Sequence, residues 1–383
     1  MHVSESPQLR PEIELLLLLA DLDIDESRVA ACRARLADYG REFDWGFFVD
    51  QAARQRLLPL VGRNIIHHGL HRAARGPSLI PYPGLYIFTY HGNKSRNVFL
   101  VDEFRKALIA LNDSGLRYAI RKGPVLGERI YGDMGLRPMG DLDVMVEKGD
   151  TAAAGAVLRD LGYVQGKLAL DGQRIEPFSR GTRTFWRLSM PVELPYQKMC
   201  GRDGIDTFVV DICTNIFQTR RDGAQFTNGL LERRIGGPLC GEQSFTLAPE
   251  DEFLDLCANL HMKATALYYV TEGGDLDVLK FLDIALVCRR ISEADKWPAV
   301  RQRAKDLGVV ESVYYAMHHA ALLYPDAVPT AELSTLRPDD CGYLDEYGAV
   351  EGEPQRWSRP FLQRLFDPRR TDEVKASSPT PRD

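Results

Sequence analysis

Two aspartates separated by a single residue stand at the start of the segment Asp141-Leu142-Asp143-Val144-Met145-Val146. Acidic and aliphatic residues alternate there with the two-residue period of a β-strand, so we expect Asp141 and Asp143 on one face and aliphatic side chains on the other. Carboxylate oxygens are ligands that Mg²⁺ prefers, and a cation between two like charges offsets their repulsion. The segment predicts a site for Mg²⁺ or Mn²⁺, although two solvated aspartates at a strand start would show the same spacing.

A third acidic residue lies in the segment 208–213, Phe-Val-Val-Asp-Ile-Cys, which alternates in the same way. The alternation places Asp211 on the face opposite the apolar side chains, where it can complete a two-metal site from a neighbouring strand. Glu193 also lies near an expected strand and is the alternative third carboxylate. The apolar neighbours of Asp211 favour Asp211.

The pentapeptide Gly-Asp-Leu-Asp-Val occurs twice, at 140–144 and again at 274–278. Apolar residues follow the second copy at helical rather than strand spacing. Asp275 and Asp277 are therefore expected to be an N-cap and a first-turn acid of a helix, without a catalytic role.

Upstream of the first copy, Arg121-Lys122-Gly123-Pro124 leads from an expected strand end through a turn into a helix. Backbone N–H groups and the helix dipole favour phosphate at such a turn, and Lys122 adds a positive charge. Arg137 stands four residues before Asp141. An arginine there can contact a phosphate or pair with the acids and hold the loop, because its planar fork suits both partners.

The remaining pattern predicts an α/β (α+β) protein whose mixed β-sheet is flanked by helical N-terminal and C-terminal parts. Expected strands cover 117–121, 141–146, 163–170, 182–190 and 207–213. Arg180, Arg183 and Arg187 are expected on a solvated strand edge, with triphosphate binding as the alternative. Expected helices cover much of 11–75, then 85–112, 125–131, 151–161, 253–269, 276–290 and 309–323. We expect an N-terminal helical region (1–95), a catalytic core (96–245), a C-terminal helical domain (246–345) and a mostly disordered tail (346–383). Within that tail, 357–366 can dock on the body.

The composition of the chain limits the kinds of binding partner that we expect. The net charge of −6 arises from 54 acidic and 48 basic residues mixed along the chain, so no uniform positive field favours a long nucleic acid. Seven cysteines form no Cys-x-x-Cys pair, which indicates reduced thiols and a cytoplasmic protein. The longest aliphatic run, 15–20, is far shorter than the roughly 20 residues that span a bilayer, so no membrane association is expected.

Lys122-Gly123, followed by the segment 131–143 with its Arg-Pro-x-x-Asp-x-Asp pattern, resembles an uncharacterised bacterial nucleotidyltransferase family. That family is part of the DNA polymerase beta-like nucleotidyltransferase superfamily. Outside this segment, Asp44-Trp45, Leu161-Gly162-Tyr163, Leu260-His261 and 282–285 also resemble the family, so the resemblance covers roughly 40–325. It implies a polymerase beta-like catalytic core at the sheet.

The resemblance also implies a reaction. A nucleoside monophosphate would pass from a nucleoside triphosphate, such as ATP, to a hydroxyl or similar group of a small-molecule or peptide acceptor, with pyrophosphate release. Asp141 and Asp143 would hold two metal ions, and Asp211 would complete the first and act as the nearest base. Lys122, Gly123 and Arg137 would bind the triphosphate. A biosynthetic or natural-product tailoring role is implied as well.

Two departures from the family pattern affect the expected nucleotide binding, and the first of them favours an alternative function. Gly123-Pro124 replaces the usual Gly-Ser, which removes a hydroxyl that would contact the triphosphate, and sixteen residues separate Pro124 from Asp141. The alternative is a catalytically silent scaffold that binds a nucleotide or peptide. Three retained carboxylates argue against it, because like charges held together are costly. RNA end modification is a third reading and would require a basic groove.

Overall fold

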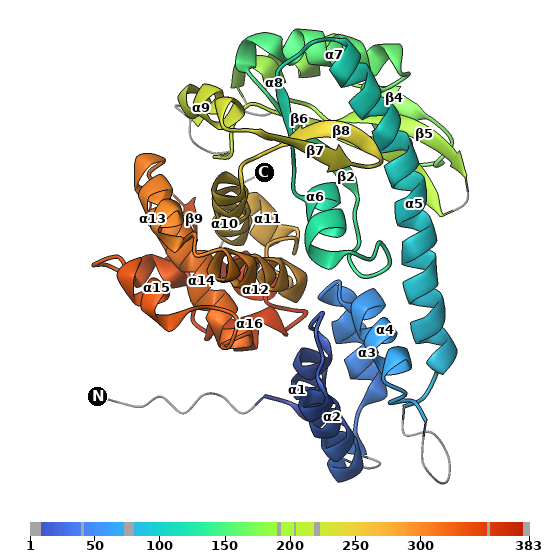
Figure 1. The fold of residues 1–383 in the computed structure, drawn as a ribbon, viewed down its shortest axis with the longest axis vertical. Helices are drawn as coiled ribbons and strands as arrows, with labels where there is room; N and C mark the ends of the chain where they lie inside the picture. Colours follow the sequence, from blue (N-terminus) through green and yellow to red (C-terminus); the bar gives the residue numbers. More distant parts are fainter. Residues whose placement is uncertain are drawn as a thin grey trace.

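The computed structural model describes residues 9–39, 42–72, 80–189, 193–202, 204–217, 223–350 and 353–377. Its N-terminal helices are α1 (Pro11–Leu19), α2 (Glu26–Tyr39), α3 (Trp45–Arg54) and α4 (Leu58–His67). A helix of 31 residues, α5 (Pro83–Asp113), then runs along one side of the molecule from these helices to the sheet (Figure 1). It begins at Pro83, where the missing N–H of proline costs nothing, and ends before Ser114-Gly115. It thus links the N-terminal helices to the sheet.

An eight-stranded mixed sheet forms the centre, in the order β4-β3-β5-β6-β2-β1-β8-β7. The strands are β1 (Tyr118–Arg121), β2 (Asp141–Val146), β3 (Val164–Leu168), β4 (Ile175–Pro177), β5 (Tyr196–Arg202), β6 (Ile205–Cys213), β7 (Ile235–Leu239) and β8 (Glu242–Thr246). The pairs β2–β6 and β1–β8 are parallel and the other neighbours antiparallel. Between strands lie α6 (Gly123–Leu126), which continues as a π-helical turn (Gly127–Tyr131), α7 (Thr151–Asp160), α8 (Arg180–Ser189) and α9 (Thr227–Glu232). The expected α/β (α+β) fold is confirmed.

The two faces of the sheet have different neighbours. Leu142, Val144 and Val146 of β2 pack in one core cluster with buried residues of α5 and α7, as the alternation predicts. On the other face, Met145 belongs to a second cluster that contains buried residues of the C-terminal helices. The acidic positions of β2 and β6 therefore face the helical part of the chain, and a site can form between them.

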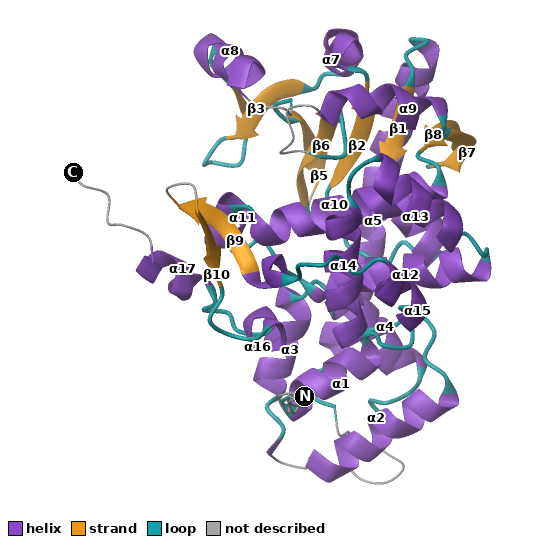
Figure 2. Ribbon diagram, turned by 90° about the vertical axis from the view of Figure 1, so that its left-hand side faces the viewer, coloured by secondary structure: helices purple, strands orange, loops and turns teal. Residues whose placement is uncertain are grey.

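The C-terminal helices are α10 (Pro249–Thr265), α11 (Leu267–Thr271), α12 (Val278–Glu293), α13 (Trp297–Asp306), α14 (Val310–Leu323) and α15 (Thr330–Thr335). Their buried side chains share one core cluster with those of α1 to α4. The two helical groups lie together on the same side of the sheet (Figure 2). No helix among the described residues is both long and apolar enough to cross a membrane.

The last part of the chain is ordered where the structure describes it. It forms β9 (Glu346–Val350), β10 (Glu353–Arg356), α16 (Phe361–Leu365) and α17 (Thr371–Ser377). Trp357, Phe361 and Leu365 are buried, so the segment docks through its apolar side chains. The expected disorder of 346–383 is therefore wrong for the described residues 353–377, because these anchoring residues outweigh the polar composition. The domain boundaries at 95, 245 and 345 stay predictions.

One expected strand, 182–190, is also wrong. The described residues of this stretch belong to helix α8, and the arginines that we expected on a strand edge lie within it. Aromatic and β-branched residues suggested a strand. The intervals between Arg180, Arg183 and Arg187, three and four residues, are instead those of helical neighbours.

Glu252, in the first turn of α10, carries a carboxyl group whose burial makes the stability of the protein depend on pH. Burial raises the pKa of its carboxyl group to about 7, and one carboxylate oxygen accepts no hydrogen bond from any described residue. The folded protein therefore binds this proton more tightly than the unfolded chain, and the free energy of unfolding falls as the pH rises from about 4.5 to about 7. We expect Glu252→Gln to remove this decline and to raise Tm at pH 8 relative to wild type.

Thermal denaturation at pH 5 and pH 8 measures the effect. Glu293→Gln, at an exposed position of the neighbouring helix α12, is the matched control and should leave the difference between the two Tm values as in wild type. An unchanged pH dependence in Glu252→Gln would contradict the assignment.

Candidate active site

Three carboxylates meet on adjacent parallel strands. The register of β2 and β6 pairs Asp143 with Asp211, and Asp141 precedes Asp143 by two residues on the same strand face. Neighbouring strands lie about 4.8 Å apart, so Asp143 and Asp211 are direct neighbours across the ladder. The structure thus brings the three residues singled out in the sequence together on the sheet face that packs against the helices, where the central strand β2 begins. We call this end of the central strands the sheet edge. Glu193, the alternative third acid, precedes β5 and is not among the residues that line the cavity described below.

The charges of these three residues affect one another. Burial and the charge of Asp143 raise the pKa of Asp141 above its ordinary value. Burial, with the charges of Asp143 and Asp141, raises the pKa of Asp211 to about 7. Burial also acts to raise the pKa of Asp143, but the nearby Lys122 and Arg121 hold it below its ordinary value. The group is therefore an acidic site in which added positive charge is favourable.

The kinds of ligand atom fit a divalent cation, since Mg²⁺ and Mn²⁺ both prefer carboxylate oxygens. In the described part of the chain, however, no group of three or more Asp, Glu, His or Cys side chains could hold a metal ion as placed. Lys122 Nζ lies 3.6 Å from Asp143 Oδ1, and the Cys213 thiol donates to the same oxygen at 3.6 Å. A metal ion bound to Asp143 would have to displace Lys122 and Cys213 from this oxygen. Rotation of these side chains is enough for that, and the backbone of β2 and β6 need not move.

The turn after β1 has an unusual backbone. Lys122 adopts φ 54° and ψ −114°, a conformation that costs free energy in a residue with a Cβ atom. The turn directs Lys122 toward Asp143 and begins α6 at Gly123. A Cβ atom on Gly123 would lie 3.4 Å from the carbonyl oxygen of Asp141, so the turn packs directly against the first aspartate.

A cavity of about 270 Å³ opens at this edge of the sheet. It is lined by the three carboxylates, by Lys122, Gly123 and Arg137, and by residues from both helical parts, namely Arg56, Asn259, Lys263, Tyr269, Lys280 and Asp283. Every site residue expected from the sequence therefore borders one cavity. The helical residues were not expected there.

Comparison with protein families gives an independent result. The model of a family described as an uncharacterised nucleotidyltransferase matches residues 41–325. The chain belongs to this nucleotidyltransferase family. Neither a curated protein nor a solved structure matches it. Membership supports nucleotidyl transfer as the general function, with a nucleoside triphosphate as a substrate.

In this nucleotidyltransferase, Arg137 is paired with an acid outside the carboxylate group. Its Nε and Nη2 atoms donate to the two oxygens of Asp283 on α12, at 2.9 and 2.7 Å. The hydroxyl of Tyr131 donates to the same carboxylate at 2.8 Å. Arg137 borders the cavity, but most of its charge is neutralised by Asp283. Of the two roles that the sequence allowed for Arg137, contact with a phosphate or holding the loop, the structure favours holding the loop.

Helix α5 holds the same loop from the other side. The fully buried Asn97 donates through Nδ2 to the carbonyl oxygens of Met134 and Arg137, at 2.7 and 2.8 Å. One turn earlier, Asn93 Nδ2 donates to the carbonyl oxygen of Gly135 at 2.9 Å. The segment that leads into Asp141 is therefore fixed between α5 and α12.

Lys263 is one of three cavity cations that the sequence did not predict, the others being Arg56 and Lys280. It forms no ion pair within 4 Å with any residue that the structure describes, and its pKa is lowered by burial and by the charges of Lys122 and Lys280. Asn259 lies one turn earlier on α10, and its Nδ2 has no hydrogen-bond partner among the described residues. The polar residues Asn259, His261 and Lys263, within a mostly apolar part of the helix, were the available signal.

The second Gly-Asp-Leu-Asp-Val copy has a structural role, as expected, but only Asp277 is at the expected kind of position, because Asp275 lies before the helix and not in its first turn. Asp277 caps α12 by accepting a hydrogen bond from the backbone N–H of Lys280 at 2.9 Å. Asp275 is fully buried and pairs with Arg370 at 2.6 Å. Neither of the two borders the cavity at the sheet edge.

Proposed function

We propose that the chain transfers a nucleoside monophosphate from a nucleoside triphosphate to a hydroxyl or similar group of a small-molecule or peptide acceptor, and releases pyrophosphate. The observation that carries the proposal is the register of Asp143 with Asp211, next to Asp141, at a cavity that also contains Lys122 and Lys263. Carboxylates for divalent cations and ammonium groups for phosphates are the two requirements of this reaction.

In the proposed reaction, an acceptor oxygen attacks the α-phosphorus and forms a new P–O bond. The bond to the bridging oxygen breaks, pyrophosphate leaves, and the acceptor's proton passes to Asp211 as the nearest base. Asp141, Asp143 and Asp211 would hold Mg²⁺ or Mn²⁺, which would supply charge neutralisation at the triphosphate. Lys122, at the turn before Gly123, and Lys263 would attract the phosphates, while Arg137 would keep the loop before Asp141 in position.

The acceptor is proposed to be small because the cavity is bounded on several sides. Arg56, from the N-terminal helices, and Tyr269 and Lys280, from the C-terminal helices, line it together with the sheet edge. The net charge of −6 also gives no general attraction for a long nucleic acid. A cytoplasmic role in the biosynthesis or tailoring of a natural product remains part of this proposal.

The test is pyrophosphate release from each of the four nucleoside triphosphates with Mg²⁺ or Mn²⁺, in the presence of metabolite and peptide acceptors. Release that depends on the metal and on an acceptor supports the proposal and identifies the donor. If no nucleoside triphosphate binds with either metal, the proposal fails.

A silent binding scaffold is the second candidate. Two observations favour it: Lys122 already neutralises Asp143 at 3.6 Å, and Pro124 stands where the family pattern has a serine. If the chain is such a scaffold, a nucleoside triphosphate together with a metal ion should raise its Tm. No acceptor should then lead to pyrophosphate release.

Lys263→Met tests the contribution of the unpaired ammonium group. Because a charge-assisted contact with phosphate is worth about 1.5–3 kcal/mol, we expect the affinity for a metal–nucleoside triphosphate complex to fall about 10- to 100-fold. Isothermal titration calorimetry measures the loss. Lys148→Met, at an exposed position after β2, is the matched control and should bind as wild type. Equal affinities of the two variants would rule out a phosphate contact by Lys263.

A further inference from the structure

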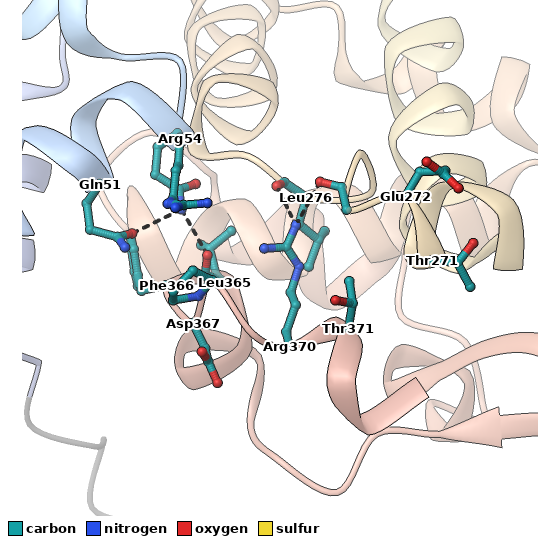
Figure 3. Close-up of a pocket in the computed structure, with 13 residues that line it drawn as sticks. Gln51, Arg54, Thr271, Glu272, Leu276, Leu365, Phe366, Asp367, Arg370 and Thr371 are labelled. Carbon is teal, nitrogen blue, oxygen red and sulfur yellow. Dashed lines mark hydrogen bonds between the residues drawn. The ribbon is translucent and has the colours of Figure 1, made fainter. Parts of the chain in front are cut away.

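A second cavity, of about 400 Å³, lies on the other side of the segment that joins α11 to α12. Three stretches that are far apart in the sequence build it: the end of α3 (51–55), the α11–α12 connection (271–276) and the C-terminal segment (365–371). Figure 3 shows Gln51 and Arg54 at one end, Glu272 and Thr271 at the other, and Arg370 between them. None of these residues borders the cavity at the sheet edge.

The walls of this second cavity are fixed by buried polar contacts. Arg370 pairs with the fully buried Asp275, at 2.6 Å. Gln55 donates to the carbonyl oxygen of Leu365 at 2.9 Å and accepts from the backbone N–H of Val278 at 3.0 Å. These contacts join the three stretches, so the cavity is a built feature and the charge of Arg370 is already neutralised.

Two polar groups at one end of the cavity have hydrogen-bond donors without an acceptor among the described residues. Gln51 is 1% exposed, and its Nε2 atom donates to no residue within the described ranges. A buried donor without an acceptor costs about 1–3 kcal/mol, which an occupant of the cavity would recover. Arg54 lies one turn along α3 and donates to Asp50 only through Nε, so its two terminal amino groups have no described hydrogen-bond acceptor.

The opposite end carries a negative charge. Glu272, at the end of α11, is exposed and forms no ion pair with any residue in the described part of the chain. The other lining carboxylate, Asp367, is already paired with Arg359. Unused hydrogen-bond donors of Gln51 and of Arg54, whose charge is partly offset by Asp50 at 2.8 Å, thus lie at one end of the cavity, and the carboxylate of Glu272 lies at the other (Figure 3).

We propose that this cavity binds a small zwitterion, an amino acid or a short peptide, with its carboxylate at Arg54 and Gln51 and its ammonium group at Glu272. A carboxylate supplies the acceptor that the Gln51 amide lacks and pairs with the arginine fork. An ammonium group supplies the counter-charge for Glu272. The occupant would lie over Arg370 and would contact the α11–α12 connection.

The α11–α12 connection lies between the second cavity and residues of the active site, so binding in the second cavity can affect the active site. Tyr269 and Lys280, which line the sheet-edge cavity, stand at the two ends of the connection whose residues 271–276 line the second cavity. An occupant that orders the connection would therefore affect both residues. The proposal itself concerns binding and does not depend on nucleotidyl transfer.

The experiment measures binding to the full chain by calorimetry and thermal shift, with L-alanine, L-glutamine, L-alanyl-L-alanine and L-alanyl-L-glutamine as probes. The N-acetyl and C-amide derivative of each probe removes one charge at a time. Arg54→Gln and Glu272→Gln change exposed side chains, so folding is not at risk, and Glu293→Gln is a control with equal exposure. Asp141→Asn separates this site from the sheet-edge cavity.

We expect at least one zwitterion to bind, and its affinity to fall about tenfold or more in Arg54→Gln and in Glu272→Gln while Glu293→Gln and Asp141→Asn bind as wild type. The N-acetyl derivative should bind weakly to wild type and equally weakly to Glu272→Gln. The proposal is overturned if no zwitterion binds, if neither charge variant weakens binding, if the singly charged derivatives bind as tightly, or if Asp141→Asn abolishes binding.

Discussion

Replacing Asp141 and Asp143 with asparagine is expected to lower pyrophosphate release by about 10³-fold or more, the scale on which loss of a catalytic group acts. Asparagine keeps the size of each side chain but removes the charges that would hold the metal ions. In the metal-free protein the same change removes repulsion, since burial and Asp143 together raise the pKa of Asp141. Tm without metal should therefore stay the same or rise in Asp141→Asn. Asp143→Asn also removes the charge that pairs with Lys122 at 3.6 Å, so its Tm should fall, and turnover is lost in both variants.

Steady-state pyrophosphate release and thermal denaturation, with and without Mg²⁺, measure the two effects. Asp277→Asn is the matched control, because it makes the same change in the second copy of the pentapeptide. Asparagine caps a helix about as well as aspartate, so this variant should retain activity and most of its stability. Turnover in the Asp141/Asp143 double variant at the wild-type rate would exclude both aspartates from the chemistry.

Asp255→Leu is expected to cost about 3–5 kcal/mol of unfolding free energy, because it leaves Arg121 charged and buried without its partner. Both side chains have almost no exposed surface, and Arg121 donates to both oxygens of Asp255, one of them from Nε at 2.8 Å. This pair joins β1 to α10 directly before Lys122. Urea denaturation, compared with wild type at pH 7, measures the loss.

The double variant Arg121→Met/Asp255→Leu separates two explanations. A buried ion pair can be replaced by apolar side chains of similar volume at little net cost, so the double variant should regain most of the lost stability. If it is as unstable as Asp255→Leu alone, the loss comes from packing or from the backbone of the turn. In that case the unpaired charge of Arg121 is not the cause of the lost stability.

The sequence was sufficient for features that depend on local pattern. Strand β2 covers the expected residues, 141–146, because the alternation of acidic and aliphatic residues is a local signal. Asp211 also lies where its alternation predicts, but its register with Asp143 depends on strand pairing that no local pattern contains.

The cavity side chains from α10 and α12 were not predictable in the same way. Lys263 and Asp283 lie more than a hundred residues after Asp141, and only tertiary packing brings them to the sheet edge. The strand expected at 182–190 failed because β-propensity is weak and easily overridden by context. The docking of 353–377 depends on Trp357, Phe361 and Leu365, whose contacts arise only when the whole chain has folded.

The link between Gln55 and Leu365 has a consequence for how the protein is made. Phe48 of α3 and Leu365 of α16 are buried in the same core cluster, although more than three hundred residues separate them. A ribosome releases the first of these long before the second, so the N-terminal helices emerge without one of their packing partners. This core cannot close until Leu365 has left the ribosome, and until then the apolar surface of α3 is available to a chaperone.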